Sequence, residues 1–149
     1  MNIAIVGNGR MGRTLDAVCA RRDDVRVIGH VGRGGCESLD ALDGLDAALD
    51  FSAPENLSML LSGAMRRQIP LVIGTTGMSG AQGEAIRVAS RRIPIVWSEN
   101  FSVGVTVLVR LARLAAQALG REFDMEIVET HHNRKVDAPS GTAKLILRQ

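Results

Sequence analysis

The chain opens with Met1-Asn2-Ile3-Ala4-Ile5-Val6-Gly7-Asn8-Gly9-Arg10-Met11-Gly12, and this stretch decides the fold. Its first half is an apolar run, which predicts a buried strand. Its second half has the spacing G-x-G-x-x-G, and a helical apolar pattern follows through Leu15 and Val18. A strand, a tight glycine turn and a helix form the context that a dinucleotide-binding fingerprint requires. The glycines would then permit the turn, the approach of a pyrophosphate and close helix packing; a glycine-rich turn without a ligand is the alternative.

The residues up to about position 100 repeat the alternation of strand and helix. Apolar runs predict further strands at residues 25–28, 46–51, 69–73 and 93–97. Between them we expect a helix over 54–68 and another that begins after Ser79 as N-cap and ends near Arg91. Because parallel neighbours need crossover connections, this order predicts an α/β fold, a Rossmann-type doubly wound parallel sheet, over residues 1–102.

Residues 103–149 are predicted to start a second domain. A linking helix from Val103 to Leu119 ends at Gly120, a residue type common after helix ends. A strand over 123–130, a polar loop over 131–138 and a helix from Pro139 onward then indicate the beginning of an α+β substrate domain. One strand and one partial helix cannot bury both faces of a sheet, so we expect this domain to be incomplete.

Composition and charge exclude several classes of protein. Apolar residues make up 46% of the chain and charged residues 23%, which is typical of a globular domain. Scattered basic pairs and only 3% aromatic residues argue against a nucleic-acid partner. Arg110 and Arg113 interrupt the longest apolar stretch, so we expect no membrane span. Cys19 and Cys36 show no metal-type spacing, and with no secretory leader ahead of them a reducing cytoplasm fits best.

The cofactor side of the site is expected at the carboxyl edge of the sheet. Fingerprints of this kind usually carry an acid after the second strand, but Val31-Gly32-Arg33 stand there, and an arginine suits a 2′-phosphate. We therefore favour NADPH over NADH, with a solvated Arg33 as the alternative. Gly74-Thr75-Thr76-Gly77 and Asn100-Phe101-Ser102 follow the fourth and fifth predicted strands at the same edge, where ligands of open α/β sheets bind.

The loop from Glu129 to Ala143 concentrates groups that can move protons and bind anions. Two histidines, an arginine and a lysine can trade protons or neutralise a carboxylate. A helix that starts near Pro139 would present N–H groups of Ser140, Gly141 and Thr142 to a substrate carboxylate. There are three alternatives: a metal site, a hydrolase triad and a solvated loop without chemistry. The metal site lacks a second ligand cluster, and the hydrolase triad lacks a nucleophile elbow.

This loop, Glu129-Thr130-His131-His132-Asn133-Arg134-Lys135-Val136-Asp137-Ala138-Pro139-Ser140-Gly141-Thr142-Ala143, resembles the signature of the dihydrodipicolinate reductase family. The motifs at Gly7–Gly12, Asp50–Glu55, Gly74–Gly77 and Asn100–Val105 occur in an order similar to the family's, so the resemblance covers the whole chain. It implies the NAD(P)H-dependent reduction of 4-hydroxy-tetrahydrodipicolinate in lysine and diaminopimelate biosynthesis. Members of the family run on beyond the equivalent of Gln149 and are expected to be homotetramers, while the oligomeric state of this chain stays open.

The resemblance also implies roles for individual residues. His131 and Lys135 match the acid–base and proton-donor positions, and no metal is expected. By resemblance the substrate carboxylates are expected at His132, Gly141 and Thr142, to which the helix start described above adds Ser140. By resemblance the cofactor is expected along Gly7, Asn8, Gly9, Arg10, Met11, Gly12, Gly74, Thr75, Thr76, Ser98, Glu99, Asn100 and Phe101, and the position after the second strand adds Arg33. The alternative function is a truncated NAD(P)-binding module without turnover.

Overall fold

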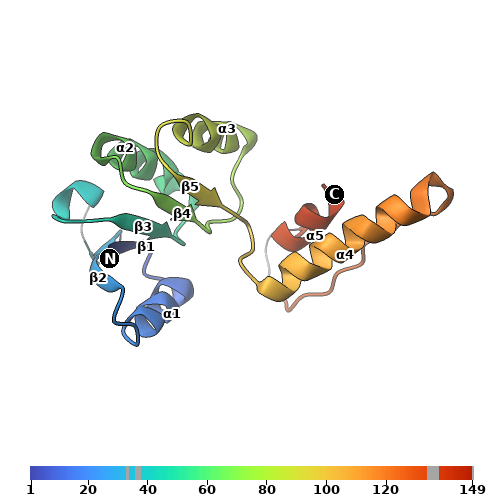
Figure 1. Ribbon diagram of the computed structural model, residues 1–149, viewed down its shortest axis with the longest axis horizontal. Coiled ribbons are helices and arrows are strands. Elements are labelled where there is room, and N and C mark those ends of the chain that lie inside the picture. Colours follow the sequence, from blue (N-terminus) through green and yellow to red (C-terminus); the bar gives the residue numbers. More distant parts are fainter. Residues whose placement is uncertain (33, 36–37, 134–137, 149) are drawn as a thin grey trace. The chain divides into compact units, whose positions relative to one another are not determined.

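The structure is a computed structural model that describes residues 1–32, 34–35, 38–133 and 138–148 (Figure 1). It divides into two compact units, Met1–Ser98 and Glu99–Gln149, which are described separately. The sequence-based division falls slightly later, between residues 102 and 103. Arg33 and Lys135, both predicted site residues, lie outside the described residues.

The first unit is built on a five-stranded sheet in the order β2-β1-β3-β4-β5, and every neighbouring pair is parallel. The predicted α/β class and the parallel sheet are confirmed. The strands are β1 Asn2–Val6, β2 Arg26–Val31, β3 Ala47–Asp50, β4 Leu71–Ile73 and β5 Ile95–Trp97. The helices are α1 Arg10–Cys19, α2 Leu57–Arg67 and α3 Gly80–Ala89, with short 3-10 turns η1 Leu39–Ala41 and η2 Pro54–Asn56.

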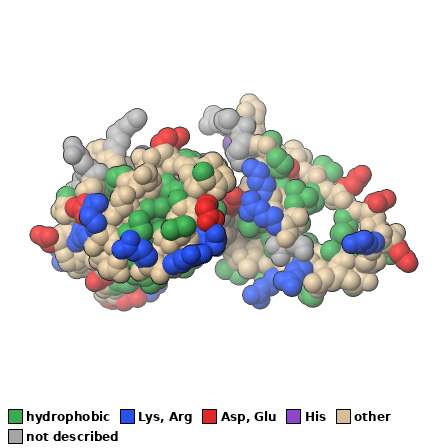
Figure 2. All heavy atoms as spheres, turned by 90° about the horizontal axis from the view of Figure 1, so that it is seen from above, with side chains coloured by type: hydrophobic (Ala, Val, Ile, Leu, Met, Phe, Trp, Pro, Cys, Tyr) green, Lys and Arg blue, Asp and Glu red, His purple; other side chains and the backbone are tan. Residues whose placement is uncertain are grey.

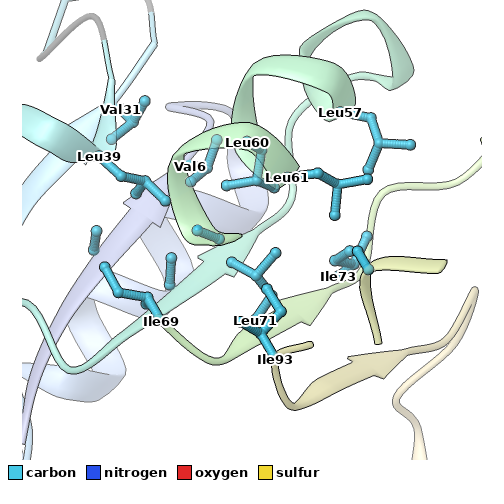
Figure 3. Close-up of a cluster of buried hydrophobic side chains, with 14 of the residues drawn as sticks. Val6, Val31, Leu39, Leu57, Leu60, Leu61, Ile69, Leu71, Ile73 and Ile93 are labelled. Carbon is cyan, nitrogen blue, oxygen red and sulfur yellow. The ribbon is translucent and has the colours of Figure 1, made fainter. Parts of the chain in front are cut away.

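Helices lie on both faces of this sheet (Figure 1). α2 and α3 cover one face, and their buried side chains belong to the main core together with those of the strands. Figure 3 shows the side chains of α2 over those of the strands. Leu60 and Leu71 are among the largest fully buried side chains of that core. α1 lies on the other face, where Gly12 and Cys19 are its buried residues. The predicted doubly wound arrangement, a parallel sheet with helices on both faces, is therefore confirmed.

The predicted N-cap of α3 is confirmed, because the Ser79 hydroxyl accepts a hydrogen bond from the Gln82 N–H and the Gln82 side chain accepts one from the Ser79 N–H. The helix predicted from Pro54 begins instead with the 3-10 turn η2 and becomes α-helical at Leu57. Gln68 follows α2 in the left-handed conformation and ends it. The observed strands β3, β4 and β5 are shorter than predicted, because ladder pairing rather than apolarity defines their ends.

The register brings four strand ends to one edge. Val6 at the end of β1 is paired with Val31 of β2 and with Asp50 of β3, and Asp50 is paired with Ile73 of β4. The residues that follow, Gly7, Gly32, Phe51 and Gly74, therefore begin loops at the same carboxyl edge. The strand order changes direction between β1 and β3, and ligands of open α/β sheets bind at such a point.

The second unit contains α4 Val103–Leu119, the 3-10 turn η3 Gly120–Glu122 and α5 Gly141–Leu147. The predicted helix from Val103 to Leu119 is confirmed, with Ser102 as its N-cap and Gly120 as its C-cap. The helix predicted from Pro139 begins at Gly141, after the N-cap Ser140. The strand predicted over 123–130 is wrong for this chain, because strands form only by pairing and the described residues contain no partner for this segment.

α4 keeps most of its apolar side chains at the surface. A stripe at Val105, Val109, Ala112 and Ala116 is partly covered, and α4 packs against α5. Val103, Leu111 and Leu114 on other faces are 80%, 58% and 61% exposed, and Figure 2 shows hydrophobic side chains on the surface of this unit. By length and composition alone, Val103–Glu122 reaches the hydropathy of a membrane span, so the expectation of no span rests on Arg110 and Arg113.

Candidate functional site

The glycines of the loop after β1 have three different surroundings. Gly7 has φ +97°, and a Cβ atom there would lie 2.7 Å from the Phe51 carbonyl oxygen, so only glycine fits. A Cβ atom at Gly12 would collide with the Gly7 carbonyl oxygen, which explains how α1 starts so close to the strand end. At Gly9 nothing lies within 4 Å of the added Cβ position. Two glycines are therefore required by the protein's own packing, whereas the third leaves open space beside the backbone.

The remaining residues of this loop present exposed side chains. Asn8, Arg10 and Met11 are exposed, and Gly9 and Arg10 form the N-cap and first residue of α1. Gly32, at the end of β2, has φ +115°, a conformation that an acidic residue would rarely adopt. The backbone conformation at Gly32 thus favours glycine over an acidic residue, in agreement with the absence of a carboxylate after the second strand.

A buried carboxylate, that of Asp50, holds the Gly74–Gly77 loop by a hydrogen bond. Asp50 is 1% exposed, and its Oδ2 accepts a hydrogen bond of 2.8 Å from the Thr75 hydroxyl. Its Oδ1 accepts bonds from the Ser52 hydroxyl at 2.6 Å and the Ser52 N–H at 3.1 Å. Burial raises the pKa of Asp50, and the hydrogen bonds from Ser52 and Thr75 act in the opposite direction. The hydroxyl of Thr75 is thus directed into the protein, while Thr76 is exposed.

Residues 98–101, all predicted to bind the cofactor, divide between the two units. Ser98 belongs to the first, where its N–H donates to the Ile73 carbonyl and continues the pairing with β4. Glu99, Asn100 and Phe101 belong to the second. There the Asn100 side-chain amide donates to the Thr142 hydroxyl at 2.9 Å, and its oxygen accepts from the Ser102 N–H at 2.8 Å. Asn100 therefore ties the start of α4 to the start of α5.

Glu99 lies against the start of α5. A Cβ atom at Gly141 would lie 3.0 Å from the Glu99 Cβ, so glycine is the residue that allows this approach. One carboxylate oxygen of Glu99 is 3.9 Å from the Arg148 guanidinium. The side chain predicted to contact the cofactor is thus placed beside Gly141, a residue predicted to bind the substrate.

Glu129 organises the loop that carries the predicted catalytic residues. One of its oxygens is 2.9 Å from the His131 Nε2 atom, and the other accepts the Ser140 N–H at 2.8 Å. These hydrogen bonds, that of Ser140 first, lower the pKa of Glu129 from 4.5 to about 2. An ionised Glu129 orients the His131 ring with a proton on Nε2 and leaves Nδ1 for other partners. His132 is exposed, and Ser140 is buried as the N-cap of α5.

The sequence does not predict Asp50 and Glu129 as site residues. Their partners stand up to 25 and 11 residues away in the chain, so the sequence pattern does not show the contacts. A carboxylate at the end of an otherwise apolar strand is the signal that points to Asp50. Among the described residues no three His, Cys, Asp or Glu side chains gather as a metal site would require, and the expected absence of a metal stays a prediction.

A doubly wound sheet with a glycine fingerprint at its switch point defines a dinucleotide-binding class of α/β protein. Two family models match the chain in order: "Dihydrodipicolinate reductase, N-terminus" over residues 1–101 and "Dihydrodipicolinate reductase, C-terminus" over residues 104–149. The chain belongs to the dihydrodipicolinate reductase family.

Curated relatives agree with this assignment. The chain is 39% identical to the 4-hydroxy-tetrahydrodipicolinate reductase of Nitrosospira multiformis, over 98% of this chain and 62% of that protein. It is 43% identical to the protein of the same name from Campylobacter lari, over 96% of this chain and 59% of the relative. This chain therefore spans about three fifths of the length of these relatives.

A solved structure shares the fold. The dipicolinate-bound dihydrodipicolinate reductase from Paenisporosarcina sp. TG-14 matches with a TM-score of 0.74 and 23% identity. The match covers 99% of this chain and 64% of that one. The predicted family resemblance is confirmed, and the roles of the individual site residues stay predictions.

Proposed function

We propose that this chain carries the cofactor-binding part and the catalytic loop of a 4-hydroxy-tetrahydrodipicolinate reductase, which reduces its substrate to tetrahydrodipicolinate with NAD(P)H. The observation that carries the proposal is the match to both parts of one reductase family, in order, along the whole chain. We place the reaction in lysine and diaminopimelate biosynthesis and in the cytoplasm.

The loop after β1 fits a dinucleotide. Gly7 and Gly12 bring the strand end and α1 together, and Gly9 leaves open space where a pyrophosphate can approach the backbone. Gly9 is also the N-cap of α1, and the N–H groups and positive dipole end of a helix N-terminus favour phosphate. When bound, the nicotinamide cofactor supplies the hydride. The absence of an acid at Gly32 favours NADPH over NADH.

The second unit supplies the proton chemistry in this proposal. Hydride addition leaves negative charge on the substrate, which a proton donor quenches. Glu129 holds His131 in one orientation at 2.9 Å, and an oriented histidine serves as acid or base near neutral pH. We assign Lys135 as the proton donor and His132, Ser140, Gly141 and Thr142 as the groups that bind the substrate's carboxylates. The solved relative named above is described as dipicolinate-bound, which supports a dicarboxylate ligand.

One observation favours the alternative, a cofactor-binding module without turnover. In the second unit only Ser140 and Ala143 are buried among the described residues. A catalytic loop on so small a core is held less firmly than catalysis requires.

The test is to titrate the purified chain with NADPH and with NADH, and then to measure NADPH oxidation with substrate generated in place from aspartate semialdehyde and pyruvate. We expect tighter binding of NADPH than of NADH. Turnover that is lost in His131→Ala, and reduced in Lys135→Ala far more than cofactor affinity is, supports the reductase. Binding without turnover supports the binding module. If neither cofactor binds, the proposal is wrong for this chain.

A further inference from the structure

The segment Asp50-Phe51-Ser52 lies between the two loops of the first unit to which the cofactor is assigned. On one side, the Phe51 N–H donates to the Val6 carbonyl at 3.0 Å, and the backbone at Phe51 and Ser52 fills the space beside Gly7. On the other side, the Gly74 N–H donates to the Asp50 carbonyl at 2.8 Å, and the Phe51 ring lies where a Gly74 side chain would be. The spacing of the two loops therefore depends on this segment.

The Asp50 side chain fixes the segment to the second loop. Its carboxylate accepts from the Ser52 hydroxyl, the Ser52 N–H and the Thr75 hydroxyl, all within 3.1 Å. The Thr75 oxygen accepts in turn from the Ser52 N–H at 2.9 Å. Asp50 is 1% and Thr75 3% exposed, so the bond between these two side chains is shielded from water, while Ser52 is partly buried.

The direction of these bonds depends on an acceptor at position 50. The Thr75 hydroxyl has one proton, and it gives that proton to Asp50 while its lone pair receives the Ser52 N–H. An amide in place of the carboxylate has one oxygen instead of two, and its NH₂ group can only donate. If that oxygen serves Ser52, the NH₂ group faces Thr75, whose proton then loses its acceptor. A buried donor left without an acceptor moves or costs free energy.

We propose that Asp50 is a positioning residue of the cofactor site, which acts through Thr75 and Ser52 to hold the loops after β1 and β4 at a fixed spacing. Because Asp50 is buried, the role we propose for it is indirect. The inference rests on the proposed function in assigning a dinucleotide to these two loops, and it adds a residue that this assignment did not contain.

The experiment compares NADPH dissociation constants and urea unfolding midpoints of the full chain. We expect Asp50→Asn and Thr75→Val to weaken NADPH binding by about tenfold or more, the effect of one lost hydrogen bond to a charged group. Thr75→Ser restores the hydroxyl and should bind NADPH more tightly than Thr75→Val. Because Asp50 acts through Thr75, the double variant should bind no more weakly than the weaker single variant, whereas independent effects would multiply.

A matched control lies at the other end of β3. Asp46 also accepts a backbone N–H, that of Asn2 at 2.6 Å, but it stands before β3 at the amino edge. Asp46→Asn should leave the NADPH constant unchanged. If Asp50→Asn changes only the unfolding midpoint, or if Thr75→Ser is as weak as Thr75→Val, Asp50 has no positioning role.

Hydrogen exchange of the cofactor-free chain separates this inference from the proposed function. The Ser52 amide should be protected in the parent and should exchange much faster in Thr75→Val and Asp50→Asn, but not in Asp46→Asn. If the parent and the variants show this pattern of exchange but the parent does not bind NADPH, the proposed function is overturned and the fixed loop spacing is still supported. Unchanged protection of Ser52 in both variants would overturn the inference even if the parent binds NADPH.

Discussion

At the scale of single residues, the loop after β1 separates what folding needs from what a ligand needs. Gly12 is confined by the Gly7 carbonyl oxygen, whereas Gly9 has open space around its missing side chain. We expect Gly12→Ala to lower the free energy of unfolding by about 1–3 kcal/mol, because the methyl group cannot fit without moving the backbone. We expect Gly9→Ala to cost less than about 1 kcal/mol, the usual difference at an N-cap. Urea unfolding of both variants checks these values.

The same pair of variants tests the ligand assignment. If the pyrophosphate approaches the backbone at Gly9, the alanine methyl group should weaken NADPH binding by about tenfold or more in a chain that still folds. Gly80→Ala is the control, since nothing lies within 4 Å of its added Cβ either and it is on α3. A Gly9→Ala chain that binds NADPH like the parent would place the cofactor elsewhere.

Residues of the site differ in how well the sequence predicts them. The glycine fingerprint was predictable because its spacing encodes a local turn, and the structure gives Gly7 and Gly12 the expected tight surroundings. The roles of Asp50 and Glu129 depend on partners that only the tertiary fold brings near, namely Thr75 and Ser140. Arg33 and Lys135 lie outside the described residues, so their assigned roles stay predictions.

At the scale of secondary structure, local sequence signals were sufficient to predict the helices but not to predict which segments pair as strands. Ser79 and Ser102 both cap helices as their side chains allow, since a cap is a contact within one turn. The segment 123–130 has strand-like composition but no partner strand among the described residues, and composition alone does not make a ladder. The turn η1 was not predicted, because three residues carry too little periodicity.

Glu129 joins the segment 123–130 to the N-cap of α5, which gives a pH-dependent prediction. Its pKa of about 2 lies below the ordinary 4.5, so its bonds to Ser140 and His131 stabilise the fold above pH 4.5. This stabilisation should be lost as the pH falls through about 2. In a carbon NMR titration of the full chain, the Glu129 carboxyl should remain ionised well below pH 4.5.

The His131→Ala variant supplies the comparison. Removal of this partner should raise the pKa of Glu129, because His131 is one of the two residues that lower it. Glu84 is the internal control, since its pKa is lowered by Arg87 on α3 and should not respond to a change at His131. A Glu129 midpoint near 4.5 in the parent chain would mean that the link to Ser140 does not persist in solution.

At the scale of the whole molecule, the apolar residues are distributed unequally between the two units. Among the residues that the structure describes, seventeen buried ones form the core cluster, and all of them belong to the first unit. No residue of α4 is buried, although its apolar side chains dominate its sequence. Burial of apolar surface is the main favourable term in folding, so the first unit should hold most of the stability of the chain.

Hydrogen exchange followed by mass spectrometry should resolve this difference. Amides of β1, which pairs on both sides, should open only with global unfolding, whereas amides of α4 should exchange roughly a hundredfold or more faster than those of β1. Equal protection of α4 and β1 would mean that the exposed face of α4 is covered in solution. Repeating the exchange at several protein concentrations then identifies the cover: protection that grows with concentration shows a second copy of the chain, because only association depends on concentration.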